Sequence, residues 1–463
     1  MDNLLRDKFI ALVGVKNAIT DPVDQVPYLK EWRDMWRGIT PVVLRPANTA
    51  EVSSIMKVAY ETNTKIVPQS GNTGLVNGQI PQGDEVVLSL NRMTKIISVD
   101  ATDNSITVEA GCILKNIQDA ADEMDRLFPL SLASEGSCRI GGNLSTNAGG
   151  LNVLAYGNTR ELCLGLEVVL ADGRVWNGLK ALRKDNTGYD LKDLFIGAEG
   201  TLGVITAAVL KLFPKPKRHD TAFAAVPSPE AALGLLNLAK AASGNRVVTF
   251  ELLPAIGVGF AVKHLQAVNP LATQSPWYVL MEFADASADA LDKCLEDALA
   301  QGLISDAAIA QTEAQRQAFW HLRESLSESQ KFEGGSIKHD VSVPISKVPE
   351  FITAATKAVE IFMPSARVCA FGHLGDGNIH FNVSQPSGID KAAYLAQWPA
   401  MNEVVFAEVL KRGGSISAEH GIGRLKVKDM LKIKSPLEIE MMRGLKLLFD
   451  PKNILNPGRV LPL

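Results

Sequence analysis

The chain has 463 residues and 46% of them are hydrophobic, which is enough apolar material for two or three domains with buried cores. The formal net charge of -4 gives no electrostatic footprint for nucleic acid, so no nucleic-acid partner is expected. The sequence contains no run of 18 apolar residues, and we therefore expect no transmembrane segment.

The first half of the chain predicts short strands and helices in alternation. Residues 41–45 and 65–69 have the composition of strands, a helix fits 50–62 between them, and a glycine-rich turn follows. An Asp-Gly turn at 172–173 predicts a hairpin, and helical spacing is found at 114–123. Runs of β-branched residues predict further strands at 85–90, 96–100, 105–109 and 203–213.

A basic stretch broken by prolines, Phe213-Pro-Lys-Pro-Lys-Arg, is interpreted as the first domain boundary. After it, alanine-rich helices alternate with strands. The helices are expected at 229–242, 288–301, 313–328, 399–412 and 436–449.

Three segments rich in glycine and small polar residues lie before that boundary. In Ser70–Gly78 the glycines let the backbone approach a ligand, but the segment is neither a Walker loop nor a GxGxxG fingerprint. Taken alone, it is explained equally well as a plain turn. Ser134–Gly150 and Gly197–Thr206 have the same character. Three such segments indicate a large ligand with a diphosphate, because burying so many polar groups without partners is costly.

Histidines and a glutamate cluster in two stretches near the end of the chain. His373 and His380 flank the turn Leu-Gly-Asp-Gly-Asn-Ile, and Glu419 is followed by His420. Two imidazoles and one carboxylate suit a divalent transition metal, and His420 is then a candidate base. The two histidines are seven apart, so a straight strand would point them in opposite directions, and only the glycine-containing turn can align them. The alternative is a hairpin with incidental histidines.

Taken together, the glycine-rich segments and Asn456-Pro-Gly resemble the FAD-binding pattern of the vanillyl-alcohol oxidase / p-cresol methylhydroxylase superfamily. The histidine and glutamate motifs resemble the metal site of its D-2-hydroxyacid dehydrogenase branch. The similarity runs from about residue 38 to the end, and it is greatest to the enzymes of that branch that oxidise D-2-hydroxyglutarate.

The resemblance implies an α+β fold in three parts. These are a two-subdomain FAD-binding domain of the PCMH type (1–216), a substrate-binding cap domain with the metal site (217–420), and a C-terminal segment that returns to the FAD domain (421–463). The FAD is expected to be non-covalent, because 68–81 contains neither His nor Cys. The resemblance implies that these residues line it: Pro68, Gln69, Ser70, Gly71, Asn72, Thr73, Gly74, Leu75, Ser134, Glu135, Gly136, Gly141, Gly142, Asn143, Ser145, Thr146, Gly149, Gly200, Gly203, Val204, Ile205 and Asn456.

The implied reaction is the oxidation of a D-2-hydroxy acid to a 2-oxo acid, with hydride transfer from C2 to flavin N5. The metal, for which zinc is favoured, would be held by His373, His380 and Glu419. The catalytic base is expected to be His420, which would also contact substrate.

Anion recognition requires cations, which the sequence offers in Arg323 and Lys338. A helical Arg and a strand Lys are more often surface residues when the sequence is read alone. The resemblance reverses this interpretation, and it adds Ser327 and Asn382 as substrate contacts. Arg can grip a carboxylate in a bidentate manner. Two cations besides the metal suit a dicarboxylate, which favours D-2-hydroxyglutarate as the substrate and 2-oxoglutarate as the product.

Other assignments stay open at this point. The chain is alternatively a D-lactate, D-malate or glycolate dehydrogenase of the same family, a zinc-dependent hydrolase, or a non-catalytic flavoprotein subunit. Electron-transfer flavoprotein or a quinone-linked acceptor, rather than NAD, is expected to reoxidise the flavin, and a homodimer is compatible with the sequence. Five scattered cysteines without a CxxC motif indicate reduced thiols, from which we expect a cytoplasmic protein.

Overall fold

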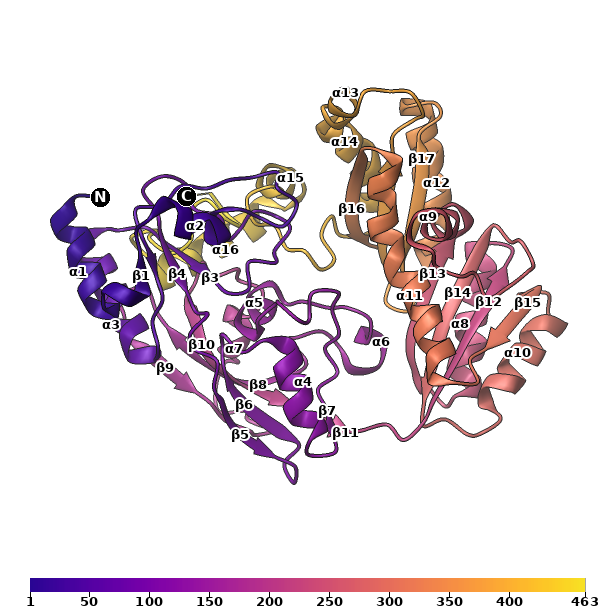
Figure 1. Cartoon of the computed structure of the whole chain (residues 1–463), viewed down its shortest axis with the longest axis horizontal. Helices are drawn as coiled ribbons and strands as arrows, with labels where there is room; N and C mark the ends of the chain where they lie inside the picture. Colours follow the sequence, from indigo (N-terminus) through magenta and orange to yellow (C-terminus); the bar gives the residue numbers. More distant parts are fainter. Residues whose placement is uncertain (463) are drawn as a thin grey trace. The chain divides into compact units, whose positions relative to one another are not determined.

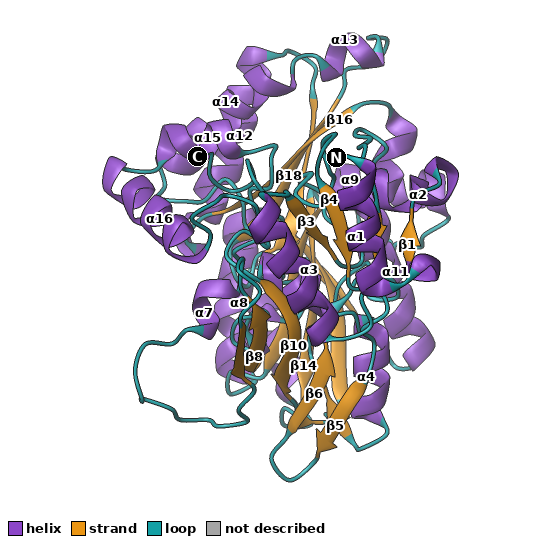
Figure 2. Cartoon of the chain, turned by 90° about the vertical axis from the view of Figure 1, so that its left-hand side faces the viewer, coloured by secondary structure: helices purple, strands orange, loops and turns teal. Residues whose placement is uncertain are grey.

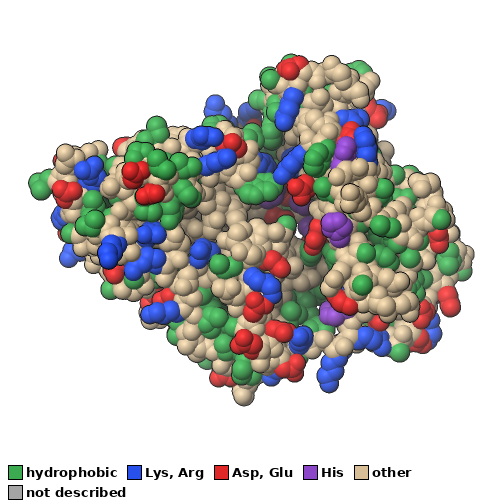
Figure 3. All heavy atoms as spheres, in the orientation of Figure 1, with side chains coloured by type: hydrophobic (Ala, Val, Ile, Leu, Met, Phe, Trp, Pro, Cys, Tyr) green, Lys and Arg blue, Asp and Glu red, His purple; other side chains and the backbone are tan. Residues whose placement is uncertain are grey.

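The computed structural model describes residues 1–462 and divides the chain into two compact units (Figure 1). The first unit comprises 1–150, 157–215 and 419–463, and the second comprises 151–156 and 216–418. Both mix helices with sheets, as the expected α+β class requires. Among residues 1–462, no helix is long and apolar enough to span a membrane. Basic and acidic side chains are interspersed on the face that Figure 3 shows.

The first unit contains two main sheets. The smaller has the order β1-β2-β4-β3, in which β4 is parallel to both β2 and β3. The larger has the order β5-β6-β10-β8-β9 and is antiparallel throughout (Figure 2). The strands are β1 (Ala18–Ile19), β2 (Val43–Leu44), β3 (Ile66–Gln69), β4 (Val86–Ser89), β5 (Ile96–Asp100), β6 (Ser105–Glu109), β7 (Arg126–Leu127), β8 (Cys163–Val169), β9 (Val175–Gly178), β10 (Val204–Lys211) and β11 (Phe213–Pro214).

Helices of the first unit begin and end close to the expected residues where capping residues are present. In the helix α3, which was expected at 50–62, the Asn48 side chain accepts a hydrogen bond from the Glu51 amide, and left-handed Asn63 ends the helix. The helices are α1 (Asn3–Val13), α2 (Pro22–Leu29), α3 (Thr49–Thr62), α4 (Leu114–Asp122), α5 (Ile140–Thr146), α7 (Lys192–Phe195), α15 (Val427–Ile433) and α16 (Pro436–Phe449).

The end of the chain folds back onto the first unit. Leu455 forms a parallel bridge with Ile66 of β3, and the Asn456 amide donates to the Ile66 carbonyl over 2.8 Å. Arg459 is fully buried and forms an ion pair with Glu85. This ion pair holds the C-terminal segment against the start of β4. The C-terminal segment therefore belongs to the core of this unit.

The second unit is built on one antiparallel sheet of seven strands in the order β15-β12-β14-β13-β17-β18-β16. These strands are β12 (His219–Val226), β13 (Val247–Pro254), β14 (Trp277–Ala284), β15 (Asp306–Ile309), β16 (Ser336–Ser342), β17 (Arg367–His373) and β18 (Asn378–Ser384). The helices are α6 (Val153–Tyr156), α8 (Pro229–Ala242), α9 (Ala255–Leu265), α10 (Ala290–Ala300), α11 (Glu313–Ser329), α12 (Val348–Phe362), α13 (Lys391–Leu395) and α14 (Trp398–Leu410).

Helices cover one face of this sheet. α9 and α11 pack on that face through an apolar cluster that includes Phe223, Leu253, Leu322 and Phe371. Because residues directly opposite one another in an antiparallel sheet share a face, the register decides which other side chains lie beside this cluster.

Candidate metal and flavin sites

A tight hairpin in the second unit brings His373 and His380 to one face of the sheet. β17 and β18 pair so that Phe371 lies opposite His380, and His373 lies two residues beyond Phe371. The two imidazole rings therefore share a face, with centroids 5.5 Å apart and planes at 79°. Gly377 makes the turn possible, because it has a φ of 85° and a Cβ there would lie 2.2 Å from the Val343 carbonyl oxygen.

Glu251, on the apolar strand β13, lies directly opposite His373 and is fully buried. Its Oε1 lies 2.6 Å from His373 Nδ1, and its Oε2 accepts a hydrogen bond of 2.6 Å from Arg323 Nε. Burial opposes ionisation, but Arg323 and His373 outweigh it and hold the Glu251 pKa at about 2. Glu251 was not among the site residues expected from the sequence. The available signal was a single charged residue inside a strand that is apolar except for Thr249.

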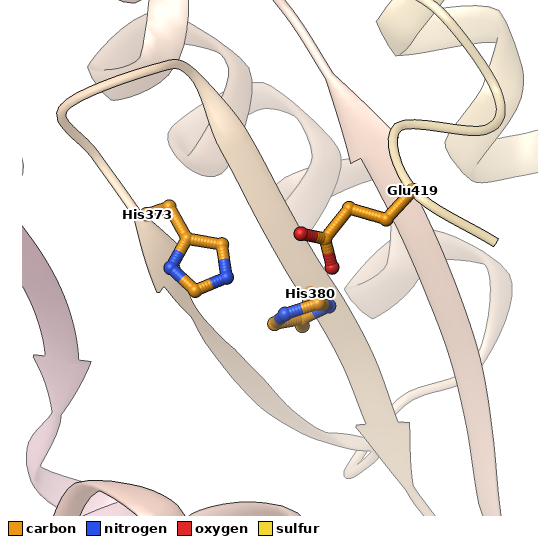
Figure 4. Close-up of side chains that lie close together, drawn as sticks. All are labelled: His373, His380 and Glu419. Carbon is orange, nitrogen blue, oxygen red and sulfur yellow. The ribbon is translucent and has the colours of Figure 1, made fainter. Parts of the chain in front are cut away.

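Glu419 and His420 follow Ala418, the last residue of the second unit, directly along the chain. Ligand atoms of His373, His380 and Glu419 all lie within 4.8 Å of one another, and Figure 4 shows the three side chains converging. Ligand atoms of Asp340, Glu419 and His420 also lie within 4.8 Å of one another, and Asp340 was not expected at the site from the sequence. Two imidazoles and a carboxylate are a donor set that fits a divalent transition metal.

The residues expected to bind substrate lie on the same side of the sheet as the two histidines. Asn382 is two residues from His380, and Lys338 lies opposite Asn382 on β16. Lys338 Nζ donates to the carbonyl oxygen and to Oγ of Ser327, over 3.1 and 3.3 Å. Arg323 lies one turn before Ser327 on α11, and both its Nε and its Nη2 contact Glu251. One edge of the Arg323 guanidinium is therefore already engaged within the protein.

Two neighbouring residues of the motif region have packing roles. Cys369 is fully buried in the cluster beneath α9 and α11, and burial raises the pKa of its thiol to about 12, so it is no thiolate ligand. His339 lies on the opposite face of the sheet, edge-on to Phe406, with Nδ1 2.8 Å from the Phe381 carbonyl oxygen.

In the first unit the glycine-rich segments meet. A Cβ on Gly71 would lie 2.7 Å from the Ser137 carbonyl oxygen and 2.9 Å from Cys138 Cα, so the loop after β3 runs directly against the second segment. A Cβ on Gly142 would lie 3.2 Å from Ser70 Cβ, and one on Gly200 would lie 3.2 Å from Pro68 Cγ. Stretches far apart in the sequence thus form one cluster.

Buried polar atoms in this cluster have no partner within the described chain. They include Ser70 Oγ, Asn72 Oδ1, Asn143 Oδ1 and Asn456 Oδ1. Native proteins satisfy nearly all such atoms, so the cluster fits a ligand that offers both donors and acceptors. FAD, with its ribityl hydroxyls, ring N–H group and diphosphate, is such a ligand.

The other residues expected around the flavin belong to the same unit. In α5 the hydroxyls of Ser145 and Thr146 donate to carbonyl oxygens one turn back, over 2.7 and 3.1 Å. Val204 and Ile205 are buried at the start of β10, directly after Gly203. The remaining expected residues of this unit are Gln69, Asn72, Thr73, Gly74, Leu75, Ser134, Glu135, Gly136, Gly141 and Gly149.

Glu199 is a further residue of this unit that was given no role from the sequence. Its two carboxylate oxygens accept hydrogen bonds from the amides of Ile422 and Gly423, over 2.7 and 2.8 Å. Its carbonyl oxygen accepts a hydrogen bond from the Asn456 side chain. Burial raises the pKa of Glu199 to about 7, against the opposing effect of the two amides. Glu199 therefore anchors the loop that follows Glu419 and His420.

Comparisons with known proteins show the class to which the chain belongs. The model of the FAD binding domain matches residues 40–178, and that of the C-terminal domain of FAD linked oxidases matches 215–460. The crystal structure of p-cresol methylhydroxylase with substrate bound has the same fold, with a TM-score of 0.78 at 18% identity over 99% of this chain and 96% of that one. The chain is thus an FAD-linked oxidoreductase with the expected PCMH-type fold.

Sequence relatives show to which family of FAD-linked oxidoreductases the chain belongs. The mitochondrial D-2-hydroxyglutarate dehydrogenase of Danio rerio is 40% identical over 451 residues, which cover 96% of this chain and 83% of that protein. The enzyme of the same name from Arabidopsis thaliana is 38% identical over 459 residues, which cover 98% of this chain and 81% of that protein. The chain belongs to the D-2-hydroxyglutarate dehydrogenase family of FAD-dependent D-2-hydroxyacid dehydrogenases.

The expected cytoplasmic location is wrong by the same comparison. The relatives from Danio rerio, Rattus norvegicus, Bos taurus and Arabidopsis thaliana are all named as mitochondrial proteins. The expectation rested on five cysteines, all of which are free and buried in the structure. Reduced, buried thiols are compatible with more than one reducing compartment, so they could not decide between them.

Proposed function

We propose that the chain oxidises D-2-hydroxyglutarate to 2-oxoglutarate, using non-covalent FAD and a divalent metal, with zinc favoured. The observation that carries this proposal is the shared sheet face of His373, His380, Asn382 and Lys338, with Ser327 held against Lys338. A cation and a hydroxyl donor next to a metal-type donor set suit a substrate with a second carboxylate.

The domain roles follow the two structural units. The glycine-rich cluster of the first unit would bind FAD, and the face of the seven-stranded sheet would bind the metal and the substrate. His373, His380 and Glu419 would hold the metal, and Asp340 is an additional carboxylate within reach of Glu419 and His420. When bound, the metal supplies Lewis acidity at the 2-hydroxyl and the flavin accepts the hydride from C2.

The protein's own residues orient the acid and move one proton. Lys338 and Ser327 would hold the distal carboxylate, and Asn382 would hold the substrate beside the two imidazoles. His420 would accept the proton of the 2-hydroxyl, because it follows a metal ligand directly and an imidazole titrates near neutral pH. Electron-transfer flavoprotein or a quinone-linked acceptor would then reoxidise the flavin, and a homodimer is compatible with the proposal.

Anaerobic reduction tests this proposal. The purified yellow protein, loaded with Zn²⁺, is mixed without oxygen with D-2-hydroxyglutarate, D-malate or D-lactate, and the flavin absorbance is followed. Bleaching should be fastest with D-2-hydroxyglutarate. Faster bleaching with D-lactate would overturn the dicarboxylate assignment. If none of the acids bleaches the flavin, the proposed dehydrogenase activity is overturned.

A further inference from the structure

Glu251 connects His373, a proposed metal ligand, to Arg323, which was expected from the sequence to contact the substrate. It lies on β13, directly opposite His373 on β17, and α11 brings Arg323 over it. Each carboxylate oxygen has its own partner, with Oε1 2.6 Å from His373 Nδ1 and Oε2 2.6 Å from both Arg323 Nε and Nη2. All three side chains are buried.

We propose that Glu251 is a positioning residue, which orients His373 for the metal and Arg323 for the substrate through one carboxylate. The contact with Glu251 places the proton of His373 on Nδ1 and leaves the lone pair of Nε2 for the metal. Carboxylates that hold a ligand histidine in this way fix its tautomer and ring orientation. The inference rests on the metal-assisted function proposed above.

Arg323 is fixed by the same contact. Its guanidinium lies 5.0 Å from the centre of the Phe371 ring, and two of its nitrogens face Glu251. It can therefore offer substrate only the edge that Glu251 does not occupy. Through Glu251, any shift of Arg323 is transmitted to His373, so the substrate and metal positions are coupled.

The chain contains a matched control on the same sheet. Glu282 on β14 is also buried, and it also joins an arginine of α11 to a histidine, since it contacts Arg316 Nε at 2.7 Å and His219 Nδ1 at 3.0 Å. None of its partners belongs to the proposed metal or substrate site. Glu251→Gln and Glu282→Gln thus remove equivalent buried charges, only one of which contacts a proposed metal ligand.

The test measures Zn²⁺ affinity of the flavin-loaded, metal-stripped full chain by competition with a chelator. Gln cannot accept from both partners, so Glu251→Gln should weaken Zn²⁺ binding about 10–100-fold, as loss of such partners does elsewhere, whereas Glu282→Gln should change it less than about twofold. Equal affinities for wild type and Glu251→Gln, or equal losses in both variants, would overturn the inference alone. A wild type that binds no Zn²⁺ would overturn the proposed metal as well.

A second measurement uses only the wild-type protein, so it does not depend on whether a variant folds. In the Zn²⁺-loaded wild type with ¹⁵N-labelled histidine, His373 should carry its proton on Nδ1 and be metal-bound through Nε2. A metal bond through Nδ1 would exclude the Glu251 contact and overturn the inference.

Discussion

Glu199 Oε1 lies 2.7 Å from the backbone nitrogen of Ile422, three residues after the proposed metal ligand Glu419. The other oxygen of Glu199 accepts a hydrogen bond from the next amide, that of Gly423. A Cβ on Gly421 would lie 2.6 Å from Glu199, so the loop can approach the carboxylate only because it lacks a side chain there. The third glycine-rich segment thereby fixes the loop that carries Glu419 and His420.

Glu199→Ala should therefore impair catalysis without removing the flavin. Each buried amide left without its acceptor costs about 1–3 kcal/mol, and the loop with His420 loses its anchor. We expect kcat to fall by about tenfold or more, with the flavin spectrum retained. Glu440→Ala, at an exposed position of α16, is the control and should be neutral. An unchanged kcat in Glu199→Ala would contradict the anchoring role.

His373→Ala should lose metal and turnover while the protein stays yellow. His373 belongs to the second unit, and every glycine-rich segment belongs to the first. Metal analysis, turnover with D-2-hydroxyglutarate and the visible spectrum would be measured on one preparation. If flavin is lost together with the metal, the two sites are not separable in the way we propose.

Local patterns made the glycine-rich segments and the histidine hairpin predictable from the sequence. Gly71 and Gly142 lie in segments that are rich in glycine, and the turn between His373 and His380 contains glycines of its own. Glu251 is different, because its partners Arg323 and His373 lie 72 and 122 residues away. No local spacing encodes such contacts, and only the register of the sheet creates them. The role of Glu199 was not predictable for the same reason, because its partner Ile422 lies 223 residues away.

Lys338→Met should discriminate between dicarboxylate and monocarboxylate substrates. The ammonium group of Lys338 lies 3.3 Å from Ser327 Oγ, and the pair is the proposed partner of the distal carboxylate. A charge-assisted hydrogen bond contributes about 1.5–3 kcal/mol, so KM for D-2-hydroxyglutarate should rise roughly 10–100-fold. Steady-state kinetics with D-lactate, which has no distal carboxylate, should show little change. An equal rise in KM for both acids would show that Lys338 does not bind the distal carboxylate.

Gly71→Ala should prevent FAD binding. A Cβ at this position would lie within 2.9 Å of backbone atoms of Ser137 and Cys138, and backbone atoms cannot move aside as a flexible side chain can. We expect a colourless or poorly folded protein. Gly444→Ala is the control, since a Cβ there meets nothing within 4 Å and alanine favours the helix α16. A fully yellow Gly71→Ala protein would contradict the close packing of the two segments.

Glu282 should contribute to stability at neutral pH and lose that contribution in acid. Burial works against its ionisation, but His219 and Arg316 hold its pKa at about 2, below the ordinary 4.5. Because the folded-state pKa is the lower one, the contribution is complete above pH 4.5 and disappears as the pH falls towards 2. The shift corresponds to about 3 kcal/mol.

Urea unfolding at several pH values measures this effect. Glu282→Gln should be destabilised by up to about 3 kcal/mol at pH 7, and the difference from wild type should narrow in acid. Glu313→Gln is the matched control, because Glu313 contacts the same Arg316 but its side chain is 63% exposed. Exposed ion pairs contribute at most about 1 kcal/mol, so this variant should unfold nearly as wild type does. A Glu282→Gln difference that stays constant from pH 7 to pH 3 would show that packing, and not charge, makes Glu282 stabilising.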